Sequence, residues 1–124
     1  MNGMERVVPK LWGEEHWIVN REYCGKKLLL KKGLRCSMHR HPIKDETFHL
    51  ETGVVFLELG GEEFFLRAGD TMHIPAGTPH RFSGLEDSVI LEFSTHHEDD
   101  DVIRESESGP IPADELAALQ QRAG

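Results

Sequence analysis

Short apolar runs rich in β-branched residues alternate with glycines through the middle of the chain, which predicts strands rather than helices. The Gly60–Gly61 pair separates Val54–Leu59 from Glu63–Arg67, which predicts a β-hairpin. Short strands at this spacing are typical of an antiparallel sandwich or barrel and not of alternating strand–helix units. We therefore expect an all-β barrel with its core over residues 15–95. The predicted strands cover residues 17–22, 27–32, 54–59, 63–67, 71–74 and 88–94.

The pattern changes after the predicted barrel. His96–Asp101 (HHEDDD) is polar at every position, and we expect a solvated loop there. Leu116 and Leu119, three positions apart with alanines between them, predict a short C-terminal helix over residues 113–122. Pro112 suits the start of that helix, where a missing N–H costs little.

The composition of the chain favours a cytoplasmic protein with one domain over residues 1–124. The net charge of −8 argues against a nucleic-acid partner, because binding to phosphate backbones needs clustered Lys and Arg. No apolar run is long enough to span a bilayer, and the first ten residues lack the apolar core of a signal peptide. Cys24 and Cys36 make no disulfide framework, so we expect both to be reduced packing residues.

Four residues from two separate segments form a candidate metal site. His39 and His41 are two positions apart, and side chains at i and i+2 of a strand lie on the same face. Glu46 follows after a short connection, and His80 comes after a Pro-x-Gly-x-x-His turn. Three imidazoles and a carboxylate suit one divalent transition metal such as Mn, Zn, Fe, Co or Ni. Each histidine alone is more typical of a surface or core-edge residue, but their joint spacing favours the metal site.

The other histidines are expected to lie outside this site. His49 is three positions from Glu46 and should therefore point to the opposite face of the strand. His73 is interpreted as a structural or sheet-facing residue, and His96 and His97 as solvated residues of the acidic segment.

The segment Gly33–Gly53 matches the first cupin motif, G-x5-H-x-H-x4-E-x6-G, at every fixed position, His39, His41 and Glu46 included. The segment Gly69–His80 matches the second motif, G-x5-P-x-G-x2-H, although Gly84 replaces the usual asparagine four positions later. The chain thus resembles a small single-domain cupin. The resemblance implies a double-sheet antiparallel β-barrel of jelly-roll type with a metal ion in its mouth.

A narrower resemblance spans about residues 10–105. The chain is similar to the cupin domain of type II mannose-6-phosphate isomerases and to cupin D-lyxose isomerases. The matching segments are K-x-W-G (10–13), Y-C-x-K (23–26), E-T-F (46–48), I-P-A-G-T-P-H-R (74–81), L-E-F-S (91–94) and D-D-x-x-R (100–104). These families imply a metal-dependent aldose–ketose isomerase that acts on a mannose- or lyxose-like sugar or sugar phosphate.

Aldose–ketose isomerisation moves a proton between C1 and C2, so it needs a base and a group that stabilises the developing oxyanion. In the lyxose isomerase pattern, a lysine two positions before the metal-binding glutamate is a catalytic candidate, and Lys44 stands there. Glu92, on the predicted strand 88–94, is the candidate partner base. The alternatives are a solvated Lys44 in a loop and a solvent-facing Glu92.

Two other functions remain open from the sequence. The same four ligands with Fe(II) would suit a dioxygenase, and a sugar- or metal-binding module would need no turnover. We also expect a homodimer, because small open-edged barrels often pair with a copy of themselves, and the N-terminal segment with Trp12 and Trp17 is a candidate contributor.

Overall fold

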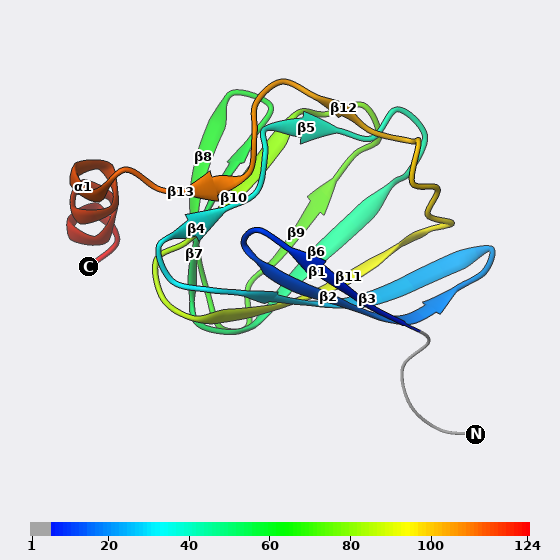
Figure 1. Ribbon diagram of the computed structural model, residues 1–124, viewed down its shortest axis with the longest axis horizontal. Helices are drawn as coiled ribbons and strands as arrows, with labels where there is room; N and C mark the ends of the chain where they lie inside the picture. Colours follow the sequence, from blue (N-terminus) through cyan, green and yellow to red (C-terminus); the bar gives the residue numbers. More distant parts are fainter. Residues whose placement is uncertain (1–5) are drawn as a thin grey trace.

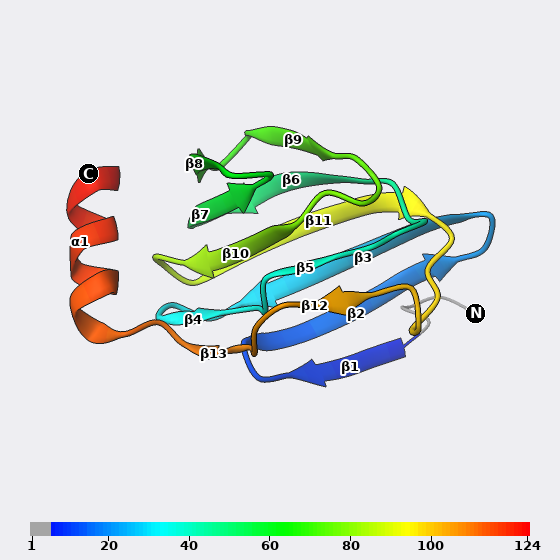
Figure 2. The same ribbon diagram turned by 90° about the horizontal axis from the view of Figure 1, so that it is seen from above.

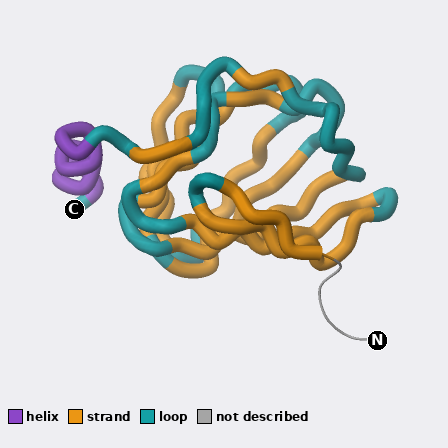
Figure 3. The backbone as a smooth tube through the Cα atoms, viewed as in Figure 1, coloured by secondary structure: helices purple, strands orange, loops and turns teal. Residues whose placement is uncertain are grey.

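The computed structural model describes residues 6–124, and in it two antiparallel β-sheets face each other with one helix at the end of the molecule (Figures 1 and 3). The strands are β1 (Arg6–Lys10), β2 (Gly13–Asn20), β3 (Tyr23–Leu30), β4 (Leu34–Arg35), β5 (His39–Arg40), β6 (Glu46–Thr52), β7 (Val54–Leu59), β8 (Glu62–Arg67), β9 (Thr71–Ile74), β10 (His80–Gly84), β11 (Ser88–Thr95), β12 (Ile103–Arg104) and β13 (Gly109–Pro110), and the helix is α1 (Ala113–Ala123).

The two sheets form the predicted double-sheet barrel of jelly-roll type. The first sheet has the order β1-β2-β3-β11-β6-β9. The second has the order β12-β5-β10-β4-β13, and β7 joins it by pairing with β10 and β8. Leu28, Ile90 and Leu50 are direct neighbours on β3, β11 and β6 and are almost completely buried. Their row fills the space between the sheets, as the alternation of apolar and polar residues requires.

Several predicted strands are confirmed. Val54–Leu59 is β7 and residues 71–74 are β9, as predicted. Gly60 and Gly61 have φ angles of 58° and 86°, which suit the type I′ turn of the predicted hairpin. The strand predicted at 17–22 is confirmed over residues 17–20 only, because β2 ends at Asn20 and a bend at residues 21 and 22 precedes β3. The inward positions of β3 include the buried Lys26, which interrupts the apolar pattern there.

The barrel also begins earlier than the predicted core of residues 15–95. Arg6–Lys10 forms β1 along one edge of the first sheet, and Trp12 packs edge-to-face on Phe82 with ring centroids 5.0 Å apart. Trp12 and Trp17 are buried within the chain, 4% and 7% exposed. The expectation that the N-terminal segment contributes to a dimer stays a prediction, as does the homodimer itself.

Residues 96–108, which we call the strap, connect the two sheets. In Figure 1 the strap leaves the end of β11 and includes β12. Figures 1 and 2 both show β12 beside β5. Ile103 and Arg104 pair with β5. The prediction of a solvated acidic loop is wrong for Asp101, which is buried, and for His97, whose side chain is 13% exposed. Both side chains form hydrogen bonds with Lys44, Asp101 with its backbone N–H and His97 with its ammonium group. These contacts remove them from water.

The predicted helix over residues 113–122 is confirmed as α1 (Ala113–Ala123), directly after Pro112. Leu119 and Leu116 pack with Val54 and Phe56 in a second apolar cluster, separate from the main core. Cys24 and Cys36 are free and buried, as predicted. In the described part of the chain, no helix is long and apolar enough to cross a membrane.

Gly53, between β6 and β7, allows a test of the fold. It has a φ of 98°, and a Cβ atom there would lie 2.6 Å from the backbone oxygen of Asp87. Gly61 has a φ of 86° but no atom within 4 Å of the corresponding position. We expect Gly53→Ala to lower the free energy of unfolding by about 3 kcal/mol, and Gly61→Ala by about 1 kcal/mol, in urea denaturation. Equal losses in both variants would contradict the close packing at Gly53.

Candidate functional site

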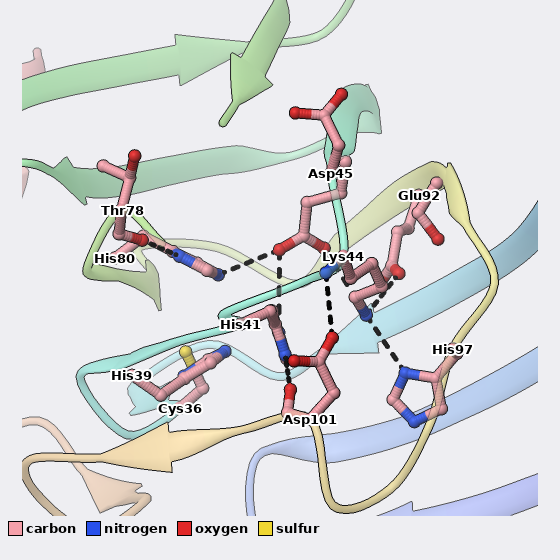
Figure 4. Close-up of polar contacts among 12 residues, drawn as sticks. Cys36, His39, His41, Lys44, Asp45, Thr78, His80, Glu92, His97 and Asp101 are labelled. Carbon is pink, nitrogen blue, oxygen red and sulfur yellow. Dashed lines mark hydrogen bonds and ion pairs between the residues drawn. The ribbon is translucent and has the colours of Figure 1, made fainter. Parts of the chain in front are cut away.

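Three of the predicted metal ligands come together where the two-residue strand β5 meets β10. His39 and His80 are direct partners across this antiparallel pair, and His41 follows β5. One ligand-capable atom from each of the three side chains lies within 4.8 Å of the other two. Figure 4 shows the three side chains gathered around one space. The predicted H-x-H pair therefore does place both imidazoles on one side of the chain.

The ring orientation of each histidine is set by a backbone carbonyl. A carbonyl oxygen only accepts hydrogen bonds, so in each ring Nδ1 carries the proton. In the neutral ring, Nε2 is then left with a lone pair, which is the form that binds metals. The carbonyl partners of His39, His41 and His80 belong to Ser37, Asp101 and Thr78, at 2.7, 2.7 and 2.9 Å from Nδ1.

Burial keeps two of these rings neutral. Burial is the main reason that the pKa of His39 is lowered to about 3. It also lowers the pKa of His41 to about 4, with Lys44 as the next largest cause. Both rings are therefore uncharged at neutral pH and have a lone pair available on Nε2.

Glu46, the fourth predicted ligand, lies at the start of β6 on the facing sheet and is not part of the group formed by the three histidines. Its Oε2 lies 3.2 Å from Nε2 of His80 and 3.6 Å from Nε2 of His41. Among the described residues, neither Glu46 Oε2 nor His80 Nε2 has a hydrogen-bond partner, although both are buried. The carboxylate oxygen and the lone pair of the ring nitrogen thus face each other at short range. Two acceptors in this position fit a cation between them, and the donor set suits a divalent transition ion.

Lys44 and Glu92 form a buried ion pair next to the histidines. Lys44 lies in the connection from β5 to β6 and Glu92 on β11, with Nζ and Oε2 3.0 Å apart. The side chains are 2% and 5% exposed, so the alternatives of a solvated lysine and a solvent-facing glutamate are wrong. Figure 4 shows the lysine extending toward Glu92.

Both members of the pair are charged. Burial alone would raise the pKa of Glu92, but Lys44 and Lys26 outweigh it and hold that pKa at about 2. Burial alone would lower the pKa of Lys44, but Glu92 and Glu46 outweigh it and the net shift is upward. At neutral pH the site therefore holds a buried carboxylate hydrogen-bonded to an ammonium group.

Lys26 also lies in the site, although the sequence assigns it no role beyond the family resemblance. It is the cross-strand neighbour of Glu92 and is 1% exposed. Its Nζ lies 4.3 Å from the centre of the Trp17 ring and 3.4 Å from Oε1 of Glu15. Lys26 stands at an inward position of an alternating strand, where an apolar residue is expected. That position was the one signal in the sequence that could have indicated a buried polar site.

Two residues of the strap were also missed by the sequence pattern. Asp101 accepts the Nδ1 proton of His41 with its carbonyl, and its carboxylate accepts the backbone N–H groups of Ile43 and Lys44 at 3.0 and 2.8 Å. His97 lies beside Lys44, with Nδ1 3.1 Å from Nζ. By contrast, His49 bonds to Thr71 away from the cavity, as its position in the strand predicts.

One cavity of about 110 Å³ brings these groups together. It is lined by the three histidines and by Glu46, Lys44, Glu92, Lys26 and His97, while Phe48 and Phe82 belong to its apolar wall. Convergent titratable groups in a cleft are a physical sign of a functional site.

The sequence profile of the cupin domain matches residues 27–95, which is more than half of the chain. The protein is a cupin. KdgF from Halomonas sp. is a similar solved structure, with a TM-score of 0.71 and 20% identity over 81% of this chain and 97% of that one. This likeness agrees with the jelly-roll fold described above.

Two curated relatives of this cupin are sugar isomerases. The D-lyxose/D-mannose isomerase of Thermosediminibacter oceani is 32% identical over 106 residues, which cover 63% of this chain and 59% of the relative. The D-lyxose ketol-isomerase of Cohnella laeviribosi is 31% identical over 112 residues, which cover 68% of this chain and 62% of the relative. The chain spans about three fifths of the length of these relatives.

The facing acceptors at Glu46 and His80 predict that metal binding depends on His80. We expect the wild type to bind one equivalent of Co²⁺ or Zn²⁺, measured by isothermal titration. Loss of an outer partner of a metal ligand already costs 10–100-fold in affinity, so His80→Ala should weaken binding by about 100-fold or more. The matched control is His49→Ala, which removes a histidine outside the cavity. Unchanged affinity in His80→Ala would contradict the site.

Proposed function

We propose that this cupin is a metal-dependent aldose–ketose isomerase whose ligands are His39, His41, Glu46 and His80. The observation that supports the proposal most directly is the charged Lys44–Glu92 pair in the same cavity as the three histidines. The reaction needs a proton acceptor and a proton donor close together, and this pair supplies one of each. The isomerase relatives supply the substrate class, a small sugar such as lyxose or mannose.

A divalent ion held by His39, His41, Glu46 and His80 would supply positive charge that polarises the sugar oxygens and stabilises negative charge developing on them. Glu92 removes the proton from C2 of the open-chain aldose and returns it to C1. Lys44 donates a proton to O1 and takes one back from the hydroxyl at C2, so the proton count balances. The ketose leaves with both residues in their starting states.

Acid–base geometry favours isomerisation over oxidation. An oxidative reaction with the same ligands would gain nothing from a charged lysine–carboxylate pair that is buried at some cost in desolvation. A binding module without turnover would not need a proton donor and acceptor 3.0 Å apart. The Lys44–Glu92 pair therefore supports the isomerase over the other two functions.

The proposal predicts ketose formation that depends on both residues. With Mn²⁺, Co²⁺ or Zn²⁺ added, the wild type should convert at least one of lyxose, mannose and their phosphorylated forms to the ketose. We expect Lys44→Met and Glu92→Gln each to lower kcat by about 100-fold or more, the usual contribution of general acid–base catalysis. The matched control is Lys27→Met. Lys27 follows Lys26 on β3, and its side chain is 41% exposed and forms an ion pair with Glu51. Its kcat should stay within about twofold of the wild-type value.

Metal content and thermal melting of each variant separate a chemical defect from a folding defect. No ketose from any sugar of the panel would contradict the isomerase. Iron-dependent oxygen uptake would instead support the dioxygenase, and a rise in melting temperature with a sugar but without turnover would support a binding module.

A further inference from the structure

His97 is held in place by contacts from three directions. Its backbone N–H donates to Oδ1 of Asn20 at 2.8 Å, and its carbonyl accepts from Nδ2 of the same residue at 3.0 Å. Its ring packs edge-to-face on Trp17, with centroids 5.0 Å apart. Nε2 lies 3.0 Å from Oδ1 of Asp99. A residue in the polar strap is thus fixed as firmly as a core residue, beside the cavity.

The partners of the ring determine which nitrogen carries the proton. The Lys44 ammonium group can only donate, so Nδ1 of His97 at 3.1 Å must accept. In the neutral ring the proton is then on Nε2, and Nε2 donates to the carboxylate of Asp99. Both contacts require the same tautomer, so Asp99 keeps His97 in the form that accepts from Lys44.

This contact changes what Lys44 can do. An ammonium group has three N–H donors in a tetrahedral arrangement. One donates to Oε2 of Glu92 at 3.0 Å and one to Nδ1 of His97 at 3.1 Å. The nearest oxygen of Glu46 is 3.8 Å away, beyond hydrogen-bond distance. Two fixed bonds determine the direction of the third N–H, which has no acceptor among residues 6–124. Figure 4 shows Lys44 between Glu92 and His97.

We propose that His97 is a positioning residue that orients the Lys44 ammonium group so that its third N–H is available to a substrate oxygen. With Glu92 as the only acceptor, the flexible side chain of Lys44 could still swing about that one hydrogen bond. With His97 as the second acceptor, the direction of the Lys44 ammonium group is fixed before the substrate binds. The reaction therefore does not have to supply the entropy cost of orienting it. The inference deepens the proposed isomerase and relies on it only for the identity of that oxygen.

Two variants at one position test this role. In His97→Asn the side-chain oxygen stands close to where Nδ1 was and can still accept from Lys44. In His97→Leu the side chain has no polar atom. Misplacement of a catalytic group by about 1 Å can cost 100-fold in rate, so we expect His97→Leu to lower kcat by about 30- to 100-fold with little change in KM. His97→Asn should stay within about fivefold of the wild-type kcat.

A measurement that needs no turnover separates this inference from the proposed function. In protein labelled with ¹⁵N-lysine, the ammonium protons of Lys44 should exchange slowly with water and give an NMR signal, since the group is buried and bonded twice. We expect the signal to persist in His97→Asn and to disappear or shift strongly in His97→Leu. The Lys44→Met variant identifies the signal.

The outcomes are decisive in each case. A kcat of His97→Leu within about threefold of the wild type would overturn the positioning role. So would equal losses in both variants when both fold and bind metal. If the wild type has no isomerase activity, the isomerase proposal fails, while the NMR signal still decides whether His97 holds Lys44. If His97→Leu does not fold, loss of the signal in His97→Asn overturns the role and its persistence supports it.

Discussion

The buried ion pair between Lys44 and Glu92 is the interaction on which the organisation of the site depends. Removing two charges from water costs several kcal/mol per ion, and well-packed apolar residues are often as stable in such a place. Removing only one partner is worse, by about 3–5 kcal/mol, because it leaves an uncompensated charge. Lys26 and Glu46 add a second cation and a second carboxylate within the same barrel. The fold therefore gives up stability at one end of its core, and catalysis is the reason that we propose for it.

The strap makes this arrangement possible. Asp101 bonds to the ring of His41 with its carbonyl and to the N–H groups of Ile43 and Lys44 with its carboxylate. One residue thus fixes both the imidazole of the histidine group and the backbone of the acid–base lysine. His97, four positions earlier, contacts the other end of the Lys44 side chain. The connection that follows β11 is therefore a structural part of the site and not a loop that only joins two sheets.

The spacing of two motifs was enough to predict the histidine group, because β-strand geometry links sequence separation to side-chain direction. His39 and His80 come from distant segments, yet the pairing of β5 with β10 brings them opposite each other. The same reasoning failed for Lys26, His97 and Asp101. Polarity along the chain predicts exposure, and each of these residues is removed from water by partners that are distant in sequence. A pattern of residue types contains no record of such partners, so the polar interior had to come from the structure.

The contact between the side chains of Glu46 and His80 is a further constraint on the site. Glu46 Oε2 and His80 Nε2 face each other at 3.2 Å, and neither has another hydrogen-bond partner in the described residues. The backbone carbonyl of Thr78 accepts the Nδ1 proton of His80, so the neutral form of this ring presents its Nε2 lone pair toward Glu46. A cation held between these two atoms would link metal binding to fold stability.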